Sequence, residues 1–299
     1  MIDGFKILNL RSEANLHGNS NLFNNWETKI SKDGEIKYHV QEFKSLVFIN
    51  KPPPKNCTSL RGSLHKYYNK GIHNHDDFYF QQVCDTIDDL SKRFNLNLHK
   101  CHLNNLEFGV NLKLNDDVSK LLLSLISYRG SIFNEIREDN ISYFQCRKSQ
   151  YIVKIYNKGL QYQLKDNVLR FEVKVTRMQF LKSRGIPIST LHDLKNKKII
   201  TELGNLLVEI FSQIVFAPVD VDFSLMSKKE KILFFELSNP HYWRNNDTSA
   251  KAYKRKQRNK KKFIELQKSY SNEPFYHAAI SYAIKEKWNS LFVQNLHHT

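Results

Sequence analysis

ISYFQCRKSQYIVKIYNKGLQYQLKDNVLRFEVKVTR, residues Ile141–Arg177, holds two runs of β-branched and aromatic residues. The runs are Tyr151–Tyr156 and Val168–Val175, and residues of these types favour β-strands. Asn157-Lys158-Gly159 follows the first run and is a turn signal. The stretch therefore predicts a short β-meander.

Alternation along the strands sorts the side chains of the meander onto two faces. The second run places the apolar residues on one face, namely Leu169, Phe171, Val173 and Val175. The polar residues of both runs are Lys154, Tyr156, Arg170, Glu172 and Lys174. A surface this basic suits a phosphate group, and a carboxylate within it suits a divalent metal.

A second strand, Asn105–Leu112, also has one polar face. Glu107, Gly109 and Asn111 lie on that face because they are two residues apart, and the residues between them are apolar. Glycine inside a strand often marks the close approach of another backbone or of a ligand. A half-buried antiparallel strand with a polar outer face would have the same pattern.

The charge of the chain indicates a polyanionic partner. The 299 residues include 46 Lys and Arg against 30 Asp and Glu, a formal net charge of +16, which favours nucleic acid over an anionic membrane surface. We find no apolar run long enough for a transmembrane helix and no signal peptide at the N-terminus. The four cysteines have no zinc-type spacing, so we expect reduced thiols in a cytoplasmic protein.

The remaining N-terminal part mixes strands and helices. Strand-like runs cover Met1–Leu10 and Tyr38–Asn50, with an Asn/Gly/Ser-rich connection around His17–Asn25. Apolar residues recur at helical spacing from Phe80 onward. The segment before that helix has two readings: a solvated turn with Asp76 or Asp77 as the helix cap, which we favour, or a metal site formed with His73 and His75. A further helix is expected over Asp116–Ser127.

The composition changes after residue 186. The remaining chain, 187–299, reads as helical, with dense apolar residues at helical spacing in Ile200–Phe216 and a basic run within Lys251–Lys268. A charge run of this kind is either a solvated face or a DNA-contacting helix, and the neighbouring aromatic residues favour DNA contact. We therefore expect an α+β chain in which domain 1–186 is followed by a smaller, helical and basic domain 187–299.

The order of motifs in the first domain resembles a known family. Tyr143 is followed by Arg147-Lys148-Ser149, then by Lys154-Ile155-Tyr156-Asn157-Lys158-Gly159 and by Leu169-Arg170-Phe171-Glu172. This order is similar to that of the replication initiators of rolling-circle plasmids and of filamentous-phage gene II/X-type proteins. The resemblance covers residues 60–180.

The resemblance implies an antiparallel, ferredoxin-like nuclease sheet and a metal-dependent endonuclease and strand transferase. In such a reaction a tyrosine attacks one DNA strand at an origin, forms a 5′-phosphotyrosyl intermediate and leaves a free 3′-OH for rolling-circle replication. The implied cofactor is Mg²⁺ or Mn²⁺, held by Glu107, Asn111 and Glu172. Asn111 departs from the family pattern, which has a second acidic residue there, so the metal would be held more weakly.

Three tyrosines compete for the role of nucleophile: Tyr143, Tyr151 and Tyr156. We favour Tyr143 because it precedes the Arg-Lys-Ser element and lies at the edge of the meander, where it is free to reach a phosphate. Lys154 and Lys158 would stabilise the developing charge with it. The expected DNA-binding residues are Arg147, Lys148, Lys251, Lys254, Arg255, Arg258 and Lys261.

The expected partner is origin DNA, either single-stranded or extruded as a hairpin. A host helicase or polymerase and a second copy of the chain are further partners that the resemblance allows, and no membrane partner is expected. The alternative function is a non-catalytic, basic DNA- or RNA-binding protein that shares the fold. Metal-dependent nicking distinguishes the two, because a binding protein would show none.

Overall fold

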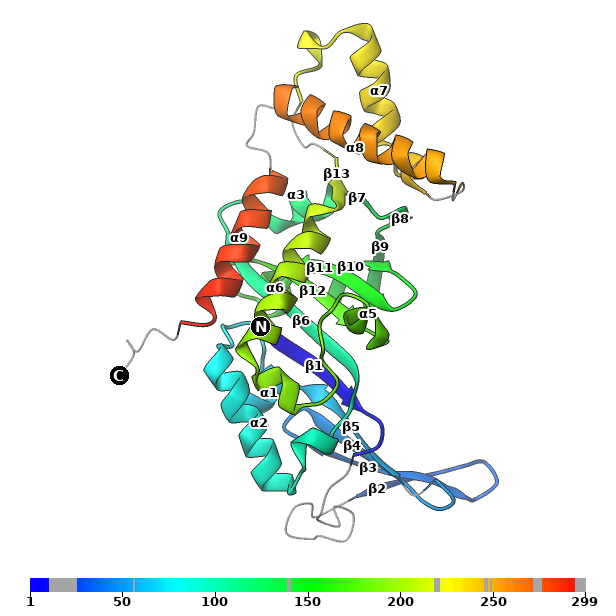
Figure 1. Ribbon diagram of the computed structural model, residues 1–299, viewed down its shortest axis with the longest axis vertical. Helices are drawn as coiled ribbons and strands as arrows, with labels where there is room; N and C mark the ends of the chain where they lie inside the picture. The colour runs from blue at the N-terminus through cyan, green and yellow to red at the C-terminus, as the bar shows by residue number, and fades with distance from the viewer. Residues whose placement is uncertain are drawn as a thin grey trace.

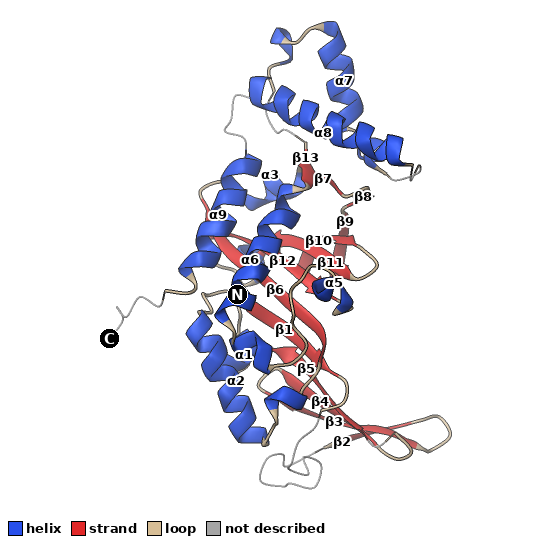
Figure 2. Cartoon of the chain, in the orientation of Figure 1, coloured by secondary structure: helices blue, strands red, loops and turns tan. Residues whose placement is uncertain are grey.

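The structure is a computed structural model, and it describes residues 1–10, 26–55, 57–138, 141–217, 221–244, 247, 249–270 and 276–293. The connection predicted around His17–Asn25 lies outside these residues. Figure 2 shows the strands as one long twisted sheet with helices packed along it. The expected α+β class is confirmed to the extent that a large antiparallel sheet is combined with helices.

The described strands of the main sheet follow the order β2-β3-β4-β5-β1-β6-β12-β11-β10-β9, and every neighbouring pair is antiparallel. Their bounds are β1 Ile2–Ile7, β2 Glu27–Ile30, β3 Ile36–Phe43, β4 Leu46–Lys51, β5 Cys57–Ser63, β6 Leu103–Leu114, β9 Asn134–Glu138, β10 Ile141–Arg147, β11 Tyr151–Asn157 and β12 Asn167–Val175. The two predicted runs of the meander are β11 and β12, and β10, which contains Tyr143, is a third strand beside them. The run Tyr38–Asn50, expected as one strand, is a hairpin that turns at Lys44 and Ser45, both with positive φ.

The four central strands have the spatial order β1-β6-β12-β11. A ferredoxin-like sheet has the order 4-1-3-2, and β6, β11 and β12 occupy positions 1, 2 and 3 of it. The N-terminal strand β1 occupies position 4. The central sheet therefore follows the ferredoxin-like order with its last strand moved to the start of the chain.

One face of this sheet is covered by two helices, α6 (Lys197–Ser212) and α9 (Tyr276–Ser290), which run beside each other (Figure 1). Phe171 of β12 packs on Phe211 of α6, with ring centroids 5.1 Å apart. Phe108 of β6 packs on Trp288 of α9 in the same way, with ring centroids 6.3 Å apart. The apolar face of the strands therefore forms the core, and the alternate side chains point to the opposite face.

The helix predicted from Phe80 is α2 (Phe80–Phe94), and it follows the short helix α1 (Leu64–Tyr68). The predicted cap was wrong, because the N-cap is Tyr79. Asp76 instead pairs with the buried His65, with 2.7 Å between Oδ1 and Nε2, and Asp77 pairs with Lys287 of α9. Both carboxylates therefore hold the segment before α2 in place through tertiary contacts that local sequence does not show.

The helices predicted over Asp116–Ser127 and Ile200–Phe216 end earlier than expected, because their last residues form strands of a small second sheet. Its strands are β7 (Leu125–Tyr128), β8 (Ser131–Ile132) and β13 (Ile214–Phe216). The helix expected over Asp116–Ser127 is α3 (Val118–Leu123), and β7 follows it directly. The remaining short helices are α4 Lys158–Gln161, α5 Gln179–Lys182, η1 Leu98–Lys100, η2 His192–Lys195 and η3 Phe223–Leu225.

The C-terminal helices divide between two hydrophobic clusters. α7 (Lys228–Ser238), η4 (Pro240–Trp243) and α8 (Ala250–Tyr270) form a separate cluster that rests on Ile126 and Val215 of the small sheet. Helices α6 and α9 belong to the main core with the strands. The boundary between 1–186 and 187–299 stays a prediction, and the packing places these two helices with the sheet. None of the described helices is both long and apolar enough to cross a membrane.

Candidate functional site: a charged face of the sheet

The polar side chains predicted from the sequence gather on the face of the sheet opposite α6 and α9. Strand register brings them together: Lys154 of β11 lies opposite Glu172 of β12, and Lys174 lies opposite Glu107 of β6. We call this surface the site face. Around Glu107, Lys154 and Glu172 it is hollowed into a pocket of about 380 Å³.

Gly109 makes room for the centre of this face. It lies opposite Glu172, and a Cβ atom at this position would lie 2.7 Å from the Cα and from the Cβ of Glu172. No such approach is tolerated between carbon atoms, so glycine is required here. The glycine noted in the sequence therefore marks the close approach of a neighbouring strand.

Arg170 lies at the centre of the site face and is fully buried. Its guanidinium pairs with Asp3 of β1 (Nη2–Oδ2, 3.2 Å) and with Glu172 (Nε–Oε2, 2.9 Å), and it donates to Asn111 Oδ1 at 3.2 Å. Burial alone would raise the pKa of Asp3, but Arg170 and a hydrogen bond from Ser63 outweigh it and lower this pKa to about 2. The Asp3 carboxylate is thus ionised and held in a fixed position.

Glu107 and Glu172 are close enough to repel each other. Burial, followed by the charge of Glu172, raises the pKa of Glu107, and Lys174 Nζ lies 2.5 Å from its Oε1. Burial would also raise the pKa of Glu172, but Arg170 and Lys154 lower it overall. Lys154 Nζ lies 3.3 Å from Glu172 Oε1. Carboxylate oxygens are the ligand type that a divalent ion such as Mg²⁺ prefers.

Asn111, the third predicted ligand, is occupied by other contacts. Its oxygen accepts from Arg170, and its Nδ2 donates to the carbonyl oxygen of His75 at 3.0 Å. In the described part of the chain, no group of three or more His, Cys, Asp or Glu side chains is arranged to hold a metal. Of the three predicted ligands, Asn111 is thus the least suited, and the metal site stays a prediction that depends on Glu107 and Glu172.

Tyr143 on β10 lies beside these charges. Lys154 Nζ is 5.5 Å from the centroid of the Tyr143 ring, a cation–π contact, and Lys154 in turn pairs with Glu172. The Tyr143 side chain is half-buried, and Glu138 lies on β9 two residues along from Ile136, the residue opposite Tyr143. Burial, followed by Glu138, raises the pKa of Tyr143. A tyrosine in this position would need a proton acceptor to react, and Glu138 is a carboxylate near enough to act on its pKa.

The other two tyrosines are held within the protein. Tyr151 points into the core, where it stacks on Phe180 at 4.0 Å and shares a hydrogen bond of 2.9 Å with the Tyr128 hydroxyl. Tyr156 is on the site face but is buried, and its hydroxyl lies 3.5 Å from Glu172 Oε2. Of the three, Tyr143 alone combines partial exposure with a place on the site face.

Lys158 closes one end of the site. It is buried, and its Nζ donates to Asn74 Oδ1 at 2.7 Å and to the Tyr156 hydroxyl at 3.4 Å. Burial, followed by the charge of Arg170, lowers the pKa of Lys158 to about 8. Lys154 behaves differently, because Glu172 and Glu107 outweigh its burial and raise its pKa. Both lysines are therefore charged at neutral pH.

The two residues predicted to bind DNA beside Tyr143 differ in their positions. Arg147 is exposed at the end of β10. Tyr143 is four residues earlier in the chain, so the two side chains lie on the same face of the strand. Lys148 turns away, and its Nζ donates to the Arg129 carbonyl oxygen (2.8 Å) and to Ser131 Oγ (2.7 Å). Arg147 is thus accessible to a phosphate, whereas the ammonium group of Lys148 already donates hydrogen bonds within the protein.

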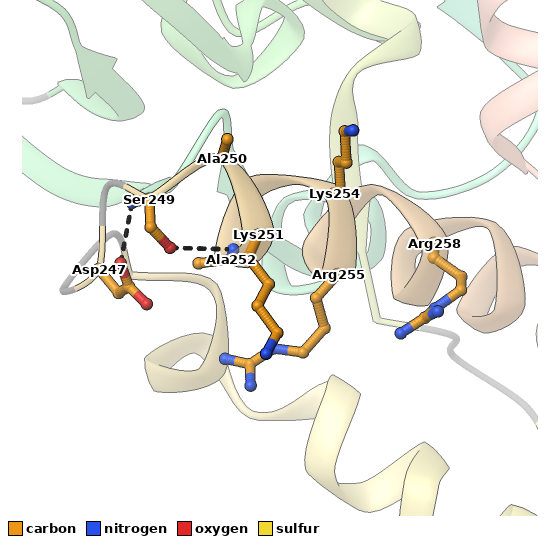
Figure 3. Close-up of a pocket in the computed structure, with 8 residues that line it drawn as sticks. All are labelled: Asp247, Ser249, Ala250, Lys251, Ala252, Lys254, Arg255 and Arg258. Carbon is orange, nitrogen blue, oxygen red and sulfur yellow. Dashed lines mark hydrogen bonds between the residues drawn. The ribbon is translucent and has the colours of Figure 1, made fainter.

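The five predicted DNA-binding residues of the C-terminal part all lie on α8 and are exposed: Lys251, Lys254, Arg255, Arg258 and Lys261. We call this surface the basic face of α8. Four of them line a pocket of about 690 Å³ at the start of the helix, where Lys251 and Arg255 extend to one side and Lys254 to the other (Figure 3). Within the described ranges, none of the five forms an ion pair.

Asp3, Arg170 and Glu138 are parts of the site that the sequence did not assign. Arg170 is part of the Leu-Arg-Phe-Glu motif. It is two residues from Glu172, so the sequence could have placed both side chains on the same face of the strand. Asp3 reaches the site only because β1 pairs with β6, more than 100 residues later in the chain. Glu138 reaches Tyr143 through the β9–β10 pairing. Neither pairing is evident from local sequence.

No family model and no curated protein matches the chain. Among solved structures, one neighbour is a rolling-circle replication initiator protein from Geobacillus stearothermophilus, with a TM-score of 0.39 and 10% identity. The match covers 77% of this chain and 90% of the neighbour. The function below rests on the site and not on this match.

Proposed function

We propose that this protein nicks single-stranded DNA through Tyr143 and forms a covalent 5′-phosphotyrosyl intermediate. The observation that carries the proposal is the contact of Lys154 with both the Tyr143 ring, 5.5 Å away, and Glu172 Oε1, 3.3 Å away. A half-buried tyrosine, a lysine and a pair of carboxylates thus share one open face. This is the combination that a tyrosine nucleophile requires for attack on a phosphodiester.

In the proposed reaction, the Tyr143 hydroxyl oxygen attacks phosphorus and its proton passes to Glu138. A new phosphorus–oxygen bond forms to the tyrosine, and the bond from phosphorus to the 3′ oxygen breaks. The 3′ oxygen takes a proton from solvent and leaves as a free hydroxyl. Lys154 would stabilise the negative charge that develops on the phosphate oxygens, and Lys158 would support it from the buried end of the site.

A divalent ion, Mg²⁺ or Mn²⁺, would be held by Glu107 and Glu172. When bound, it would polarise the phosphate and offset its charge. The 3′-hydroxyl released by nicking would prime synthesis, so we propose origin DNA as the substrate and rolling-circle replication initiation as the role. A host helicase or polymerase and a second copy of the chain are partners that such a role would involve, and we propose the cytoplasm as its place.

A covalent adduct with DNA tests the proposal. The protein is incubated with a library of single-stranded oligonucleotides and Mg²⁺ or Mn²⁺, and the denatured products are examined for a protein–DNA band. We expect an adduct with the wild type and none with Tyr143→Phe, because this change removes only the hydroxyl. Tyr151→Phe is the matched control and should keep the adduct. An adduct that survives in Tyr143→Phe would place the nucleophile elsewhere.

A second function is favoured by a different observation: each carboxylate of the site is already paired with a lysine or an arginine. Carboxylates that are all paired in this way would stabilise the fold, as expected for a non-catalytic DNA- or RNA-binding protein. Such a protein would bind oligonucleotides in a salt-dependent manner. It would form no adduct with either metal, so the same experiment separates the two functions.

A further inference from the structure

A cleft between α8 and the small sheet has the composition of a nucleotide site. It has a volume of about 410 Å³, within the range of pockets that hold small ligands. Three cationic residues line it, Arg129, Lys256 and Lys260, and no carboxylate of the described residues does so. The remaining lining is aromatic, amide or small, and includes Tyr253 and Gln257.

Four of the residues that line the cleft lie on one face of α8. Tyr253, Lys256, Gln257 and Lys260 are separated by three, one and three residues, so they lie on one face. With 3.6 residues per turn, this face is roughly 180° around the helix from Lys251, Arg255 and Arg258. The cleft is therefore a different surface from the basic face of α8.

Lys260 supplies a cation without a matching anion. Its Nζ donates to the Ser212 carbonyl oxygen at 3.1 Å, and among the described residues it forms no ion pair. An ammonium group has three donors, so two remain for a ligand. Burial lowers the pKa of Lys260 to about 8, and a bound anion would offset this cost of burial.

Tyr253 supplies an aromatic surface at the same cleft, and 60% of its side chain is exposed. The opposite wall is the turn between β7 and β8, where Arg129 and Gly130 both have positive φ. This geometry fits a two-residue turn of type I′, which projects Arg129 at the rim. Aromatic rings with nearby cations are the means by which proteins hold single-stranded nucleic acid: bases stack and phosphates pair.

One end of β10 is tied to the turn that lines the cleft. Lys148 follows Arg147 at the end of that strand and donates to the Arg129 carbonyl oxygen at 2.8 Å. From Tyr143 to Lys148 the strand covers about 17 Å. A DNA strand that runs from Tyr143 past Arg147 would reach the cleft by turning around this end of β10.

The geometry points to a binding site for one nucleotide of single-stranded DNA in this cleft, with its base on Tyr253 and its phosphate on Lys260, Lys256 and Arg129. The inference rests on the proposed function, which supplies the strand. It adds a second contact point that would hold the strand next to the nicking site. Trp243 forms part of the wall but is buried, and its Nε1 donates to the Leu237 carbonyl oxygen at 2.7 Å.

Fluorescence anisotropy with a fluorescein-labelled thymidine 12-mer tests the site. Tyr253→Ala should weaken binding at least about fivefold, because loss of one base–aromatic stack costs about 1 kcal/mol or more. Tyr253→Phe keeps the ring and should bind like the wild type. Lys260→Gln should reduce the slope of log K against log[salt] by about 0.7, as expected for one phosphate contact. Lys229→Gln, an exposed lysine on α7, is the control and should change neither quantity.

Photo-crosslinking gives an independent measurement. A 12-mer with 5-iodo-deoxyuridine should crosslink to Tyr253 in the wild type. Unchanged affinity in both Tyr253→Ala and Lys260→Gln, with crosslinks elsewhere, would overturn the site while leaving the proposed function intact. A wild-type protein that does not bind the 12-mer at all would overturn the proposed function as well, so the two failures are distinguishable.

Discussion

The site face of the sheet and the basic face of α8 use charge in opposite ways. On the site face, Arg170 is buried between Asp3 and Glu172, and each of these three charges has a partner within 3.2 Å. On α8, Lys254, Arg255 and Arg258 are exposed and form no ion pair with the described residues. Buried, paired charges fix geometry, whereas exposed, unpaired cations attract any polyanion. In the proposed function, the sheet would position single-stranded DNA and nick it. Helix α8 would supply general affinity for the DNA.

The largest expected effect separates the two regions by stability. Arg170→Leu leaves Asp3 and Glu172 buried without their cation, and this should lower the free energy of unfolding by about 3–5 kcal/mol. The matched change on α8 is Lys254→Leu, which should change it by less than about 0.5 kcal/mol. Urea denaturation followed by circular dichroism measures both. A loss below about 1 kcal/mol for Arg170→Leu would show that the network is not structural.

The next effect concerns chemistry. Glu107→Gln keeps the shape of the side chain but removes its charge, so it should lower adduct formation with Mg²⁺ or Mn²⁺ at least about 100-fold. Binding of single-stranded DNA should be maintained, because the cations of the site remain. The rate of adduct formation and the anisotropy of a labelled oligonucleotide are measured in parallel. Undiminished adduct formation in both Glu107→Gln and Glu172→Gln would refute the assignment of these carboxylates.

The pH dependence of stability should report on the site face. The pKa of Asp3 is about 2 in the folded protein, against an ordinary value of 3.8. Its contribution, about 2 kcal/mol, is present above pH 4 and is lost as the pH falls towards 2, because the unfolded chain binds the proton first. Asp3→Asn should therefore lose less stability than the wild type between pH 4 and 2. Parallel curves for the two proteins would contradict the pairing with Arg170.

The smallest effect belongs to α8. If about five cations pair with phosphates, log K for single-stranded DNA should fall with log[salt] at a slope of roughly −3.5. Replacing Lys254, Arg255 and Arg258 by Gln should flatten this slope by about 2, while the rate of adduct formation at saturating DNA remains as in the wild type. An unchanged slope would mean that the basic face of α8 is only a solvated surface.

Local patterns predicted the faces of the strands but not their neighbours. Alternation placed Lys154 with Tyr156, and Glu107 with Asn111, on common faces, and the structure has them there. Helical spacing predicted α2, although the cap of α2 was wrong because Asp76 is held by His65. Such contacts arise between segments that are distant in sequence, where periodicity carries no information.

The functional site shows the same limit. Tyr143 was expected at the edge of the meander, but it lies within β10, between β9 and β11, and its proximity to Glu138 depends on the β9–β10 hairpin. Asn111 has the residue type of a metal ligand, yet its oxygen accepts from Arg170, which only strand register reveals. The ends of α3 and α6 were missed because pairing in the small sheet outweighs helical propensity at Leu125–Tyr128 and Ile214–Phe216.

Mapping the linked residue in the protein–DNA adduct tests the central claim most directly. After incubation with oligonucleotides and Mn²⁺, the adduct is digested with protease and nuclease, and the modified peptide is identified by mass spectrometry. We predict a phosphotyrosyl linkage at Tyr143. A linkage at Tyr151, Tyr156 or any other residue would contradict the assignment, and the absence of any adduct with either metal would contradict nicking itself.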